Sequence, residues 1–269
     1  MTKRQAYQHQ VEVAQLVLAG KNIILQAPTG AGKTLAALMP FLNAVQNRGD
    51  FPSRCIYSVP MRVLANQFTE EYRKEIEDSS YADDITIAMQ TGENQGAREL
   101  DKNLIFATID QTLSSFLLSP YSLSKRKSNI NAGAVVGSYL VFDEFHLFDP
   151  ASTLPTTLHM LKMLDGIAPF VLMTATFSER MLNDLAQELN AVIVPQNEDA
   201  RRAMNALPSQ NKLRRYHTVD TAMQAETILQ KHTGRTLVIC NVVDRARALF
   251  EEVRAQTDKQ VLLLHSRLL

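Results

Sequence analysis

A run of small residues near the start of the chain has the types and spacing of a loop that holds phosphates. It consists of Ala27, Pro28, Thr29, Gly30, Ala31, Gly32, Lys33 and Thr34. Small residues let backbone N–H groups curl around phosphate oxygens, and a helix that starts directly afterwards adds partial positive charge. Lys33 would reach the β- and γ-phosphates, and the Thr34 hydroxyl would bind Mg²⁺. The run therefore predicts a site for ATP and Mg²⁺; the alternative is a glycine-rich helix cap with an exposed lysine.

Two adjacent carboxylates, Asp143 and Glu144, follow the apolar run Tyr139–Phe142. Because neighbouring residues on a strand point to opposite faces, we expect them to have different tasks. Asp143 would hold Mg²⁺ through its water shell, and Glu144 would polarise an attacking water. His146 would project on the side of Glu144 and link it to nearby elements. Alone, such residues are also typical of a solvated strand end, so the phosphate loop upstream carries the prediction that Lys33, Glu144 and His146 are catalytic.

The segments around these residues alternate between strand-like and helix-like patterns. The expected strands are Asn22–Gln26, Cys55–Val59, Ile85–Met89, Leu104–Ala107, Tyr139–Phe142, Pro169–Thr174 and Val192–Val194. The expected helices include Val11–Leu18, Leu35–Val45, Val63–Ile76 and Glu179–Leu189. Residues 119–138 are rich in Ser, Asn and Gly and predict a long exposed loop, whose basic run Lys125–Lys127 is solvated or docks a partner or DNA. The predicted fold class is α/β, a P-loop parallel sheet covered by helices.

The charge of the chain divides it into unlike parts. Its 269 residues include 28 Lys and Arg and 28 Asp and Glu, a net charge of +0. This balance excludes a uniformly basic nucleic-acid coat and a polybasic membrane binder, but not a local basic face. Residues 1–200 hold 16 basic and 22 acidic side chains, whereas residues 201–269 hold 12 and 6. The step falls in the proline-interrupted stretch 201–215, which predicts a linker that is solvated or contacts nucleic acid.

We therefore expect an ATP-binding domain over residues 1–200, a basic linker over 201–215 and a partial second domain over 216–269. The last part predicts helices at Ala222–Lys231 and Asp244–Arg254 and strands at Thr236–Asn241 and Val261–His265. One such unit is too little for a complete second sheet. The sequence has no signal peptide and no apolar run of about 18 residues, so we expect a cytoplasmic protein without a membrane partner.

In their order and spacing, the motifs resemble those of the superfamily 2 helicases of the DExH type. Thr174-Ala175-Thr176 looks like motif III of that family, whose hydroxyls couple nucleotide state to nucleic-acid binding. Gln10, ten residues before Gly20, lies where the family's adenine-reading glutamine falls, with Tyr7 available to stack. The other matches are Ala27–Thr34 with motif I, Val59–Gln67 with motif Ia, Ala107–Gln111 with motif Ib, Asp143–His146 with motif II and Val238–Asn241 with motif IV. The resemblance implies a RecA-like first domain and the start of a second RecA-like lobe.

The same resemblance implies a track for the sugar-phosphate backbone of single-stranded DNA. Its residues would be Pro60, Arg62, Thr91, Gly92, Thr108 and Gln111. Backbone amides, hydroxyls and one arginine suffice, because a translocase must not prefer a sequence. The alternative for Arg62 is an ordinary surface arginine.

Within the superfamily, the chain is similar to the CRISPR-associated helicases of type I interference. The similarity lies in Thr108-x-Asp110-Gln111, in Phe145 of the acidic box and in His265-Ser266-Arg267; Asp143–Asp149 looks most like the stand-alone helicase subunit of subtype I-D. It implies an ATP-dependent DNA helicase or translocase on single-stranded DNA, beside a CRISPR target-recognition complex and a separate HD nuclease subunit. The alternatives are a DExH helicase of RNA or DNA outside CRISPR, and a nucleotide-gated nucleic-acid-binding module without motor activity.

The family's arginine finger belongs to motif VI of the second lobe. No Gln-x-x-Gly-Arg-x-x-Arg pattern occurs before Leu269. Loss of such an arginine lowers the rate by about 10³–10⁵-fold in related phosphoryl-transfer sites. We therefore expect this chain to be C-terminally incomplete, to bind ATP weakly and to hydrolyse it very slowly or not at all.

Overall fold

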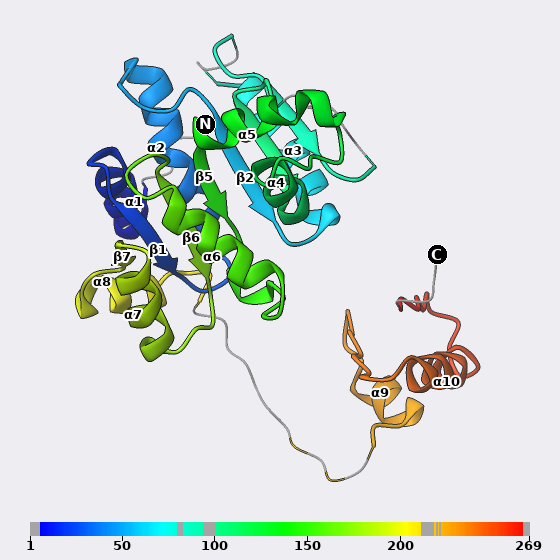
Figure 1. Ribbon diagram of the computed structural model, residues 1–269. Helices are drawn as coiled ribbons and strands as arrows, with labels where there is room; N and C mark the ends of the chain where they lie inside the picture. The colour runs from blue at the N-terminus through cyan, green and yellow to red at the C-terminus, as the bar shows by residue number, and fades with distance from the viewer. Residues whose placement is uncertain are drawn as a thin grey trace. The chain divides into compact units, whose positions relative to one another are not determined.

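Among the residues that the structure describes, seven strands form one parallel sheet (Figure 1). The structure, a computed structural model, describes residues 6–79, 83–93, 100–210 and 222–265, together with 218 and 220. The strand order across the sheet is β3-β4-β2-β5-β6-β1-β7. The strands are β1 (Asn22–Gln26), β2 (Cys55–Val59), β3 (Ile87–Gln90), β4 (Leu104–Thr108), β5 (Tyr139–Phe142), β6 (Phe170–Thr174) and β7 (Ala191–Val194).

Helices cover both faces of this sheet, because side chains alternate between the faces along each strand. Tyr139 and Val141 of β5 pack into one apolar core with α1 (Gln8–Leu18), α2 (Lys33–Asn47), α3 (Arg62–Glu77) and α8 (Glu198–Asn205). Leu140 and Phe142 pack into the other with α4 (Ile109–Phe116), α5 (Ser128–Val136), α6 (Thr153–Met163) and α7 (Glu179–Glu188). Two short 3-10 helices, η1 (Lys125–Lys127) and η2 (Phe145–Leu147), complete the first part. The predicted α/β class, a parallel sheet covered by helices, is confirmed.

The carboxyl ends of all these strands lie at one edge of the sheet, since the strands are parallel. Ligands of open α/β sheets bind outside this edge. Motifs I, Ia, Ib, II and III all lie at or just after the end of a strand, and the fold therefore gathers them at a single edge. None of the described helices combines the length and the apolar character that crossing a membrane requires.

The prediction of a long exposed loop over residues 119–138 is wrong. Residues 125–136 form η1 and α5 instead, and the side chains of Asn131 and Val135 are fully buried. The Ser, Asn and Gly residues of this stretch are poor helix formers. Burial of Ala134 and Val135 in the core beneath them outweighs that preference, which sequence composition alone does not reveal.

The chain divides into the units Met1–Lys212 and Leu213–Leu269. Residues 201–210 of the predicted linker belong to the packed part of the first unit, because α8 runs to Asn205 and buries Met204 against the sheet. Leu207 packs against the same core. The rest of the predicted linker, residues 211–215, lies outside the described residues.

The second unit contains two helices in its described residues, α9 (Ala225–Lys231) and α10 (Val243–Arg254). They meet at Ala225, Ile228 and Leu249. The segments 236–241 and 261–265, for which we predicted strands, pair with no other strand in the described part of the chain. Leu237 and Ile239 are accordingly 85% and 83% exposed. A strand pattern alone does not make a strand, because its backbone needs a paired neighbour.

Candidate functional site

The predicted phosphate loop links the end of β1 to the start of α2. Gly30 and Gly32 adopt φ angles of +83° and +77°, in the left-handed region that favours glycine. A Cβ on Gly32 would also stand 2.5 Å from Nε2 of Gln10, so any larger residue there would have to displace the Gln10 side chain. Lys33 begins α2 directly after this turn. The loop therefore has the tight turn and the adjoining helix N-terminus that phosphate binding requires.

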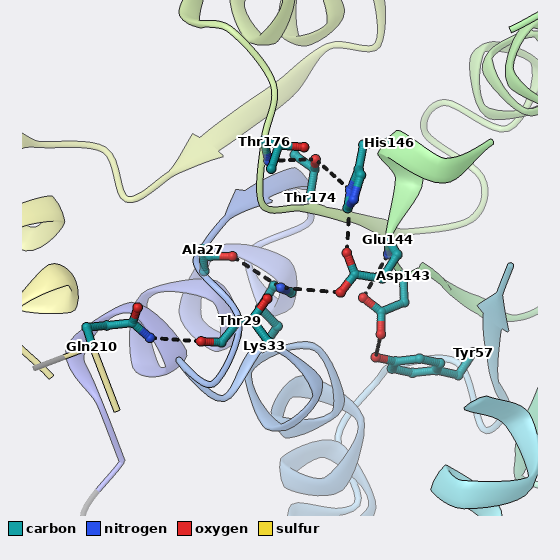
Figure 2. Close-up of polar contacts among 10 residues, drawn as sticks. All are labelled: Ala27, Thr29, Lys33, Tyr57, Asp143, Glu144, His146, Thr174, Thr176 and Gln210. Carbon is teal, nitrogen blue, oxygen red and sulfur yellow. Dashed lines mark hydrogen bonds and ion pairs between the residues drawn. The ribbon is translucent and has the colours of Figure 1, made fainter. Parts of the chain in front are cut away.

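The side chain of Lys33 points across the loop toward the acidic box (Figure 2). Only 8% of the residue is exposed. Its Nζ donates to the carbonyl oxygen of Ala27 at 3.2 Å and lies 3.6 Å from Oε1 of Glu144. The alternative of a helix cap with an exposed lysine therefore does not describe this residue.

The acidic box lies beyond the end of β5 rather than on the strand. β5 ends at Phe142, and Glu144 adopts a left-handed backbone with φ +48°. The expectation that strand alternation separates the two carboxylates is therefore wrong: the turn at Glu144 separates them. Asp143 stabilises this turn, because its Oδ1 accepts the backbone N–H of Glu144 at 2.8 Å. Left-handed non-glycine residues persist where the surroundings enforce them, and they cluster at functional sites.

His146 connects Glu144 to the end of β6. Its Nδ1 lies 3.4 Å from Oε2 of Glu144 and 3.4 Å from Oγ1 of Thr174. The backbone N–H of Thr176 donates to the same Thr174 hydroxyl at 3.4 Å. Figure 2 shows this chain of contacts, which runs from Lys33 through Glu144 and His146 to the two threonines. The structure thus brings the predicted catalytic and coupling residues together from three elements.

Asp143 faces a partner that the sequence analysis did not include. Its Oδ2 accepts the hydroxyl of Tyr57, on the neighbouring strand β2, at 2.8 Å. Burial raises the pKa of Asp143, while the hydrogen bonds from Tyr57 and from the Glu144 backbone, together with the Lys33 charge, act to lower it. Burial and the nearby Asp143 charge raise the pKa of Tyr57 well above its usual value, so its phenol remains a donor. A buried tyrosine hydroxyl needs a hydrogen-bond partner. The position of Tyr57 within an apolar strand was therefore the one sequence feature that could have indicated this contact.

The start of α1 reaches the phosphate loop through consecutive side chains. Gln10 donates from Nε2 to the carbonyl of Gly32 at 3.1 Å, and its Oε1 accepts the N–H of Tyr7 at 2.9 Å. His9, absent from the predicted site, contacts the carbonyl of Ala31 through Nε2 at 2.9 Å. Burial lowers the pKa of His9, partly offset by that hydrogen bond. Tyr7, predicted to stack on adenine, stacks on the ring of His9 at 5.9 Å and is 39% exposed.

The turn after α8 also contacts the phosphate loop. Nε2 of Gln210 donates to the carbonyl of Thr29 at 2.8 Å (Figure 2). A Cβ on Gly30 would lie 3.5 Å from Cβ of Ser209, an ordinary contact. Ser209 and Gln210 fall within the predicted linker 201–215, and nothing in the sequence indicated that they contact the phosphate loop.

The residues of the predicted nucleic-acid track lie at the ends of three neighbouring strands. Pro60 and Arg62 follow β2, Thr91 and Gly92 follow β3, and Thr108 and Gln111 lie where β4 runs into α4. Only Arg62 and Gly92 are exposed, and Pro60 is half-buried. Thr91, Thr108 and Gln111 are buried, and Gln111 accepts from Nε2 of Gln90 at 3.3 Å.

Arg62 forms an exposed ion pair in the structure. Its Nη1 lies 2.5 Å from Oε1 of Glu93, and a Cβ on Gly92 would lie 3.2 Å from its Nη2. A guanidinium that pairs with a carboxylate is equally suited to a phosphate. In the structure, Glu93 therefore binds the Arg62 guanidinium, which we predicted to bind a phosphate of the nucleic acid.

No group of three or more His, Cys, Asp or Glu side chains that could hold a metal occurs among the described residues. A resident metal cage is thus absent from the described part of the chain. Mg²⁺ in nucleotide sites is instead held by one or two protein oxygens together with phosphates and waters. Asp143 and Thr34 supply an oxygen donor set of that kind, and the Asp143 carboxylate is held by two hydrogen bonds.

Comparison with known families decides the relationship. Residues 7–185 match the DEAD/DEAH box helicase family. The chain belongs to this family. The matched region contains the phosphate loop, the acidic box and the strands that carry the predicted track.

Curated helicases of several kinds are related to this family member. An ATP-dependent DNA helicase Hel308 of Methanocella arvoryzae is 29% identical over 190 residues, which are 68% of this chain and 23% of that protein. A putative CRISPR-associated nuclease/helicase Cas3 of Methanocaldococcus jannaschii is 26% identical over 283 aligned positions, covering 92% of this chain and 35% of that protein. The chain thus spans about a quarter to a third of the length of these relatives.

Solved structures share the fold. The DUF1998 helicase MrfA bound to DNA matches with a TM-score of 0.55 and 22% identity, over 71% of this chain and 26% of that one. The likeness confirms the RecA-like helicase fold of the first unit.

Proposed function

We propose that this DEAD/DEAH box family member is the ATP-binding part of an ATP-dependent nucleic-acid motor. The observation that carries the proposal is the polar chain that joins Lys33, Glu144, His146 and Thr174 at one sheet edge. It links a phosphate loop to a carboxylate and then to the strand end that follows. Through such a connection, a change in the bound nucleotide could alter the position of the strand end that carries Thr174.

Each residue of the proposed site has a distinct task. The loop 27–34 and the N-terminus of α2 bind the phosphates, and Lys33 neutralises their charge. Thr34 and Asp143 would hold Mg²⁺, which supplies charge neutralisation at the phosphates when bound. Glu144, held by Lys33 and His146, accepts a proton from the attacking water. Gln10 and Tyr7, at the start of α1, would read the base of the nucleotide.

We further propose that the substrate is single-stranded DNA in CRISPR type I interference, with cleavage by a separate HD nuclease subunit. The alignment with the Cas3 relative supports this proposal, because it covers 92% of the chain, whereas the Hel308 match covers 68%. Relatives named as DNA helicases support a DNA substrate. A helicase outside CRISPR is the second candidate, favoured by the Hel308 match and by the fold of MrfA.

Nucleic-acid stimulation of ATP hydrolysis by the full-length protein tests these proposals. We expect single-stranded DNA to accelerate hydrolysis, and duplex DNA to do so less, because the proposed track would contact only one backbone. Single-stranded RNA should also stimulate less, in line with the relatives named as DNA helicases. Stimulation by RNA alone would overturn the CRISPR assignment. A rate that no nucleic acid changes would overturn the motor.

The Arg62–Glu93 pair yields a prediction on nucleic-acid affinity. We expect Glu93→Gln to tighten binding of single-stranded DNA about two- to fivefold, since an exposed ion pair contributes about 0.2–1 kcal/mol and its loss frees Arg62 for a phosphate. Fluorescence anisotropy of a labelled oligonucleotide at low salt measures the change.

A matched control separates this effect from a general change of charge. Glu188→Gln removes the same charge from another exposed ion pair, with Lys162 of α6, and should leave DNA affinity unchanged. Equal tightening by both variants would show that net charge, and not the release of Arg62, is responsible.

A further inference from the structure

Tyr57 stands where the two halves of the functional edge meet. The predicted track lies at the ends of β3, β4 and β2, whereas the nucleotide and coupling residues lie at the ends of β5, β6 and β1, and β2 and β5 are neighbours in the sheet. The Tyr57 hydroxyl donates from β2 to Asp143 beyond β5 at 2.8 Å. Figure 2 shows this contact beneath the Lys33–Glu144 pair.

The Tyr57 ring is packed within the apolar core. The residue is fully buried, and its ring lies 5.6 Å from that of Phe68 and 5.4 Å from that of Phe106. Tyr57 pairs in register with Val141, and just beyond the end of β5 the backbone N–H of Asp143 donates to the carbonyl of Ser58 at 2.9 Å, which holds Asp143 beside β2. Packing in the core therefore positions the Tyr57 hydroxyl as a hydrogen-bond donor to the Asp143 carboxylate.

Both oxygens of the Asp143 carboxylate are consequently held. Oδ2 accepts from Tyr57 and Oδ1 accepts from the backbone of Glu144. The carboxylate that would hold the cation of the nucleotide is thus fixed by one side-chain donor, Tyr57, and one backbone donor, Glu144.

We propose that Tyr57 is a positioning residue that orients the Asp143 carboxylate for the divalent cation of the bound nucleotide. The inference rests on the proposed function. Outer hydrogen-bond partners of metal-binding carboxylates fix their orientation, and their loss lowers metal affinity about 10–100-fold. Tyr57 touches neither phosphate nor water in this role and acts only through Asp143.

The test compares nucleotide affinity with and without metal. A fluorescent ATP analogue is titrated into the protein in excess Mg²⁺ and in EDTA. The dissociation constant in EDTA divided by that in Mg²⁺ is the metal ratio, which measures how much the metal strengthens binding. We expect Tyr57→Phe, which removes only the hydroxyl, to lower this ratio about tenfold or more. Its affinity in EDTA should stay within about twofold of the wild type.

Tyr139→Phe is the matched control. Tyr139 is another fully buried tyrosine, on β5, and its hydroxyl donates to the carbonyl of Ala37 at 2.7 Å without contacting Asp143. We expect this variant to lose thermal stability like Tyr57→Phe while keeping the wild-type metal ratio. That outcome would support the assignment, because a merely structural loss would affect both variants.

Two results would overturn the inference. One is a wild-type metal ratio in Tyr57→Phe, and the other is an equal drop in both variants. Either would leave the proposed function intact if the wild-type protein binds the analogue more tightly with Mg²⁺. Failure of the wild type to bind nucleotide in either condition would overturn the proposed function, and this inference with it.

Discussion

Replacing Lys33 with alanine is expected to weaken ATP binding by about a hundredfold. Lys33 is 92% buried, and its ammonium stands between the Ala27 carbonyl and Glu144 at the mouth of the phosphate loop. A charge-assisted hydrogen bond contributes about 1.5–3 kcal/mol, and the ammonium would serve two phosphates. The variant also leaves Glu144 facing the phosphates without a neutralising charge. Titration with a fluorescent ATP analogue measures the loss.

Lys162→Ala is the control for this variant. Lys162 is an exposed lysine on α6 whose partner is Glu188, and its removal should leave ATP affinity at the wild-type value. Thermal denaturation without nucleotide shows whether Lys33→Ala remains folded, and the rise in Tm on adding ATP should vanish in that variant alone. Unchanged nucleotide affinity in a folded Lys33→Ala protein would refute the phosphate-loop assignment.

The sequence predicts the sheet well because each strand of the first unit is a short apolar run in a parallel arrangement. All seven expected strands occur, with ends displaced by two residues or fewer. Helix α5 escaped prediction because its residues are poor helix formers, and only burial of Val135 and its neighbours makes it helical. The strand segments of the second unit failed for the converse reason, since their pattern is right but they lack a paired neighbour in the described residues.

Most motif residues could be predicted because they lie at or just after a strand end, where spacing along the sequence is informative; Tyr7 and Gln10, at the start of α1, are the exception. Contacts between motifs could not be predicted. Tyr57, Glu93 and Gln210 act on residues that lie 31 to 181 positions away along the chain, and no local pattern encodes such pairs. The left-handed turn at Glu144 could not be predicted either, because glutamate rarely adopts a positive φ.

The strand order gives the functional edge a simple division. Strands β3, β4 and β2 end in the residues proposed to contact nucleic acid, β1 and β5 end in those proposed to bind the nucleotide and its cation, and β6, between them, ends in the predicted coupling threonines. The two groups of strand ends therefore adjoin at β2 and β5. Two neighbouring side chains of β2 make polar contacts here: Tyr57 bonds Asp143, while Ser58 contacts Thr112 of α4 at 2.7 Å on the opposite face.

Replacing Glu144 with glutamine is expected to stop ATP hydrolysis while preserving ATP binding. A positioned general base accelerates a reaction about 10²–10⁴-fold, and a neutral amide cannot take the proton. Glutamine has nearly the same size, so the turn at position 144 and the contact with His146 should persist. In the full-length protein with saturating ATP, Mg²⁺ and single-stranded DNA, we expect kcat to fall by about 10²–10⁴-fold while the dissociation constant of ATP changes less than about threefold.

Separate measurement of kcat and of the dissociation constant of ATP distinguishes a catalytic role of Glu144 from a structural one. Glu144 also lies 3.6 Å from Lys33, so a purely structural role would act through the lysine and weaken ATP binding as much as turnover. Glu188→Gln, an exposed change of the same kind, should affect neither quantity. A Glu144→Gln protein that turns over ATP at more than a tenth of the wild-type rate would remove Glu144 from the chemistry. Loss of binding in proportion to kcat would instead make it a partner of Lys33, because only a residue that acts in the transition state lowers turnover alone.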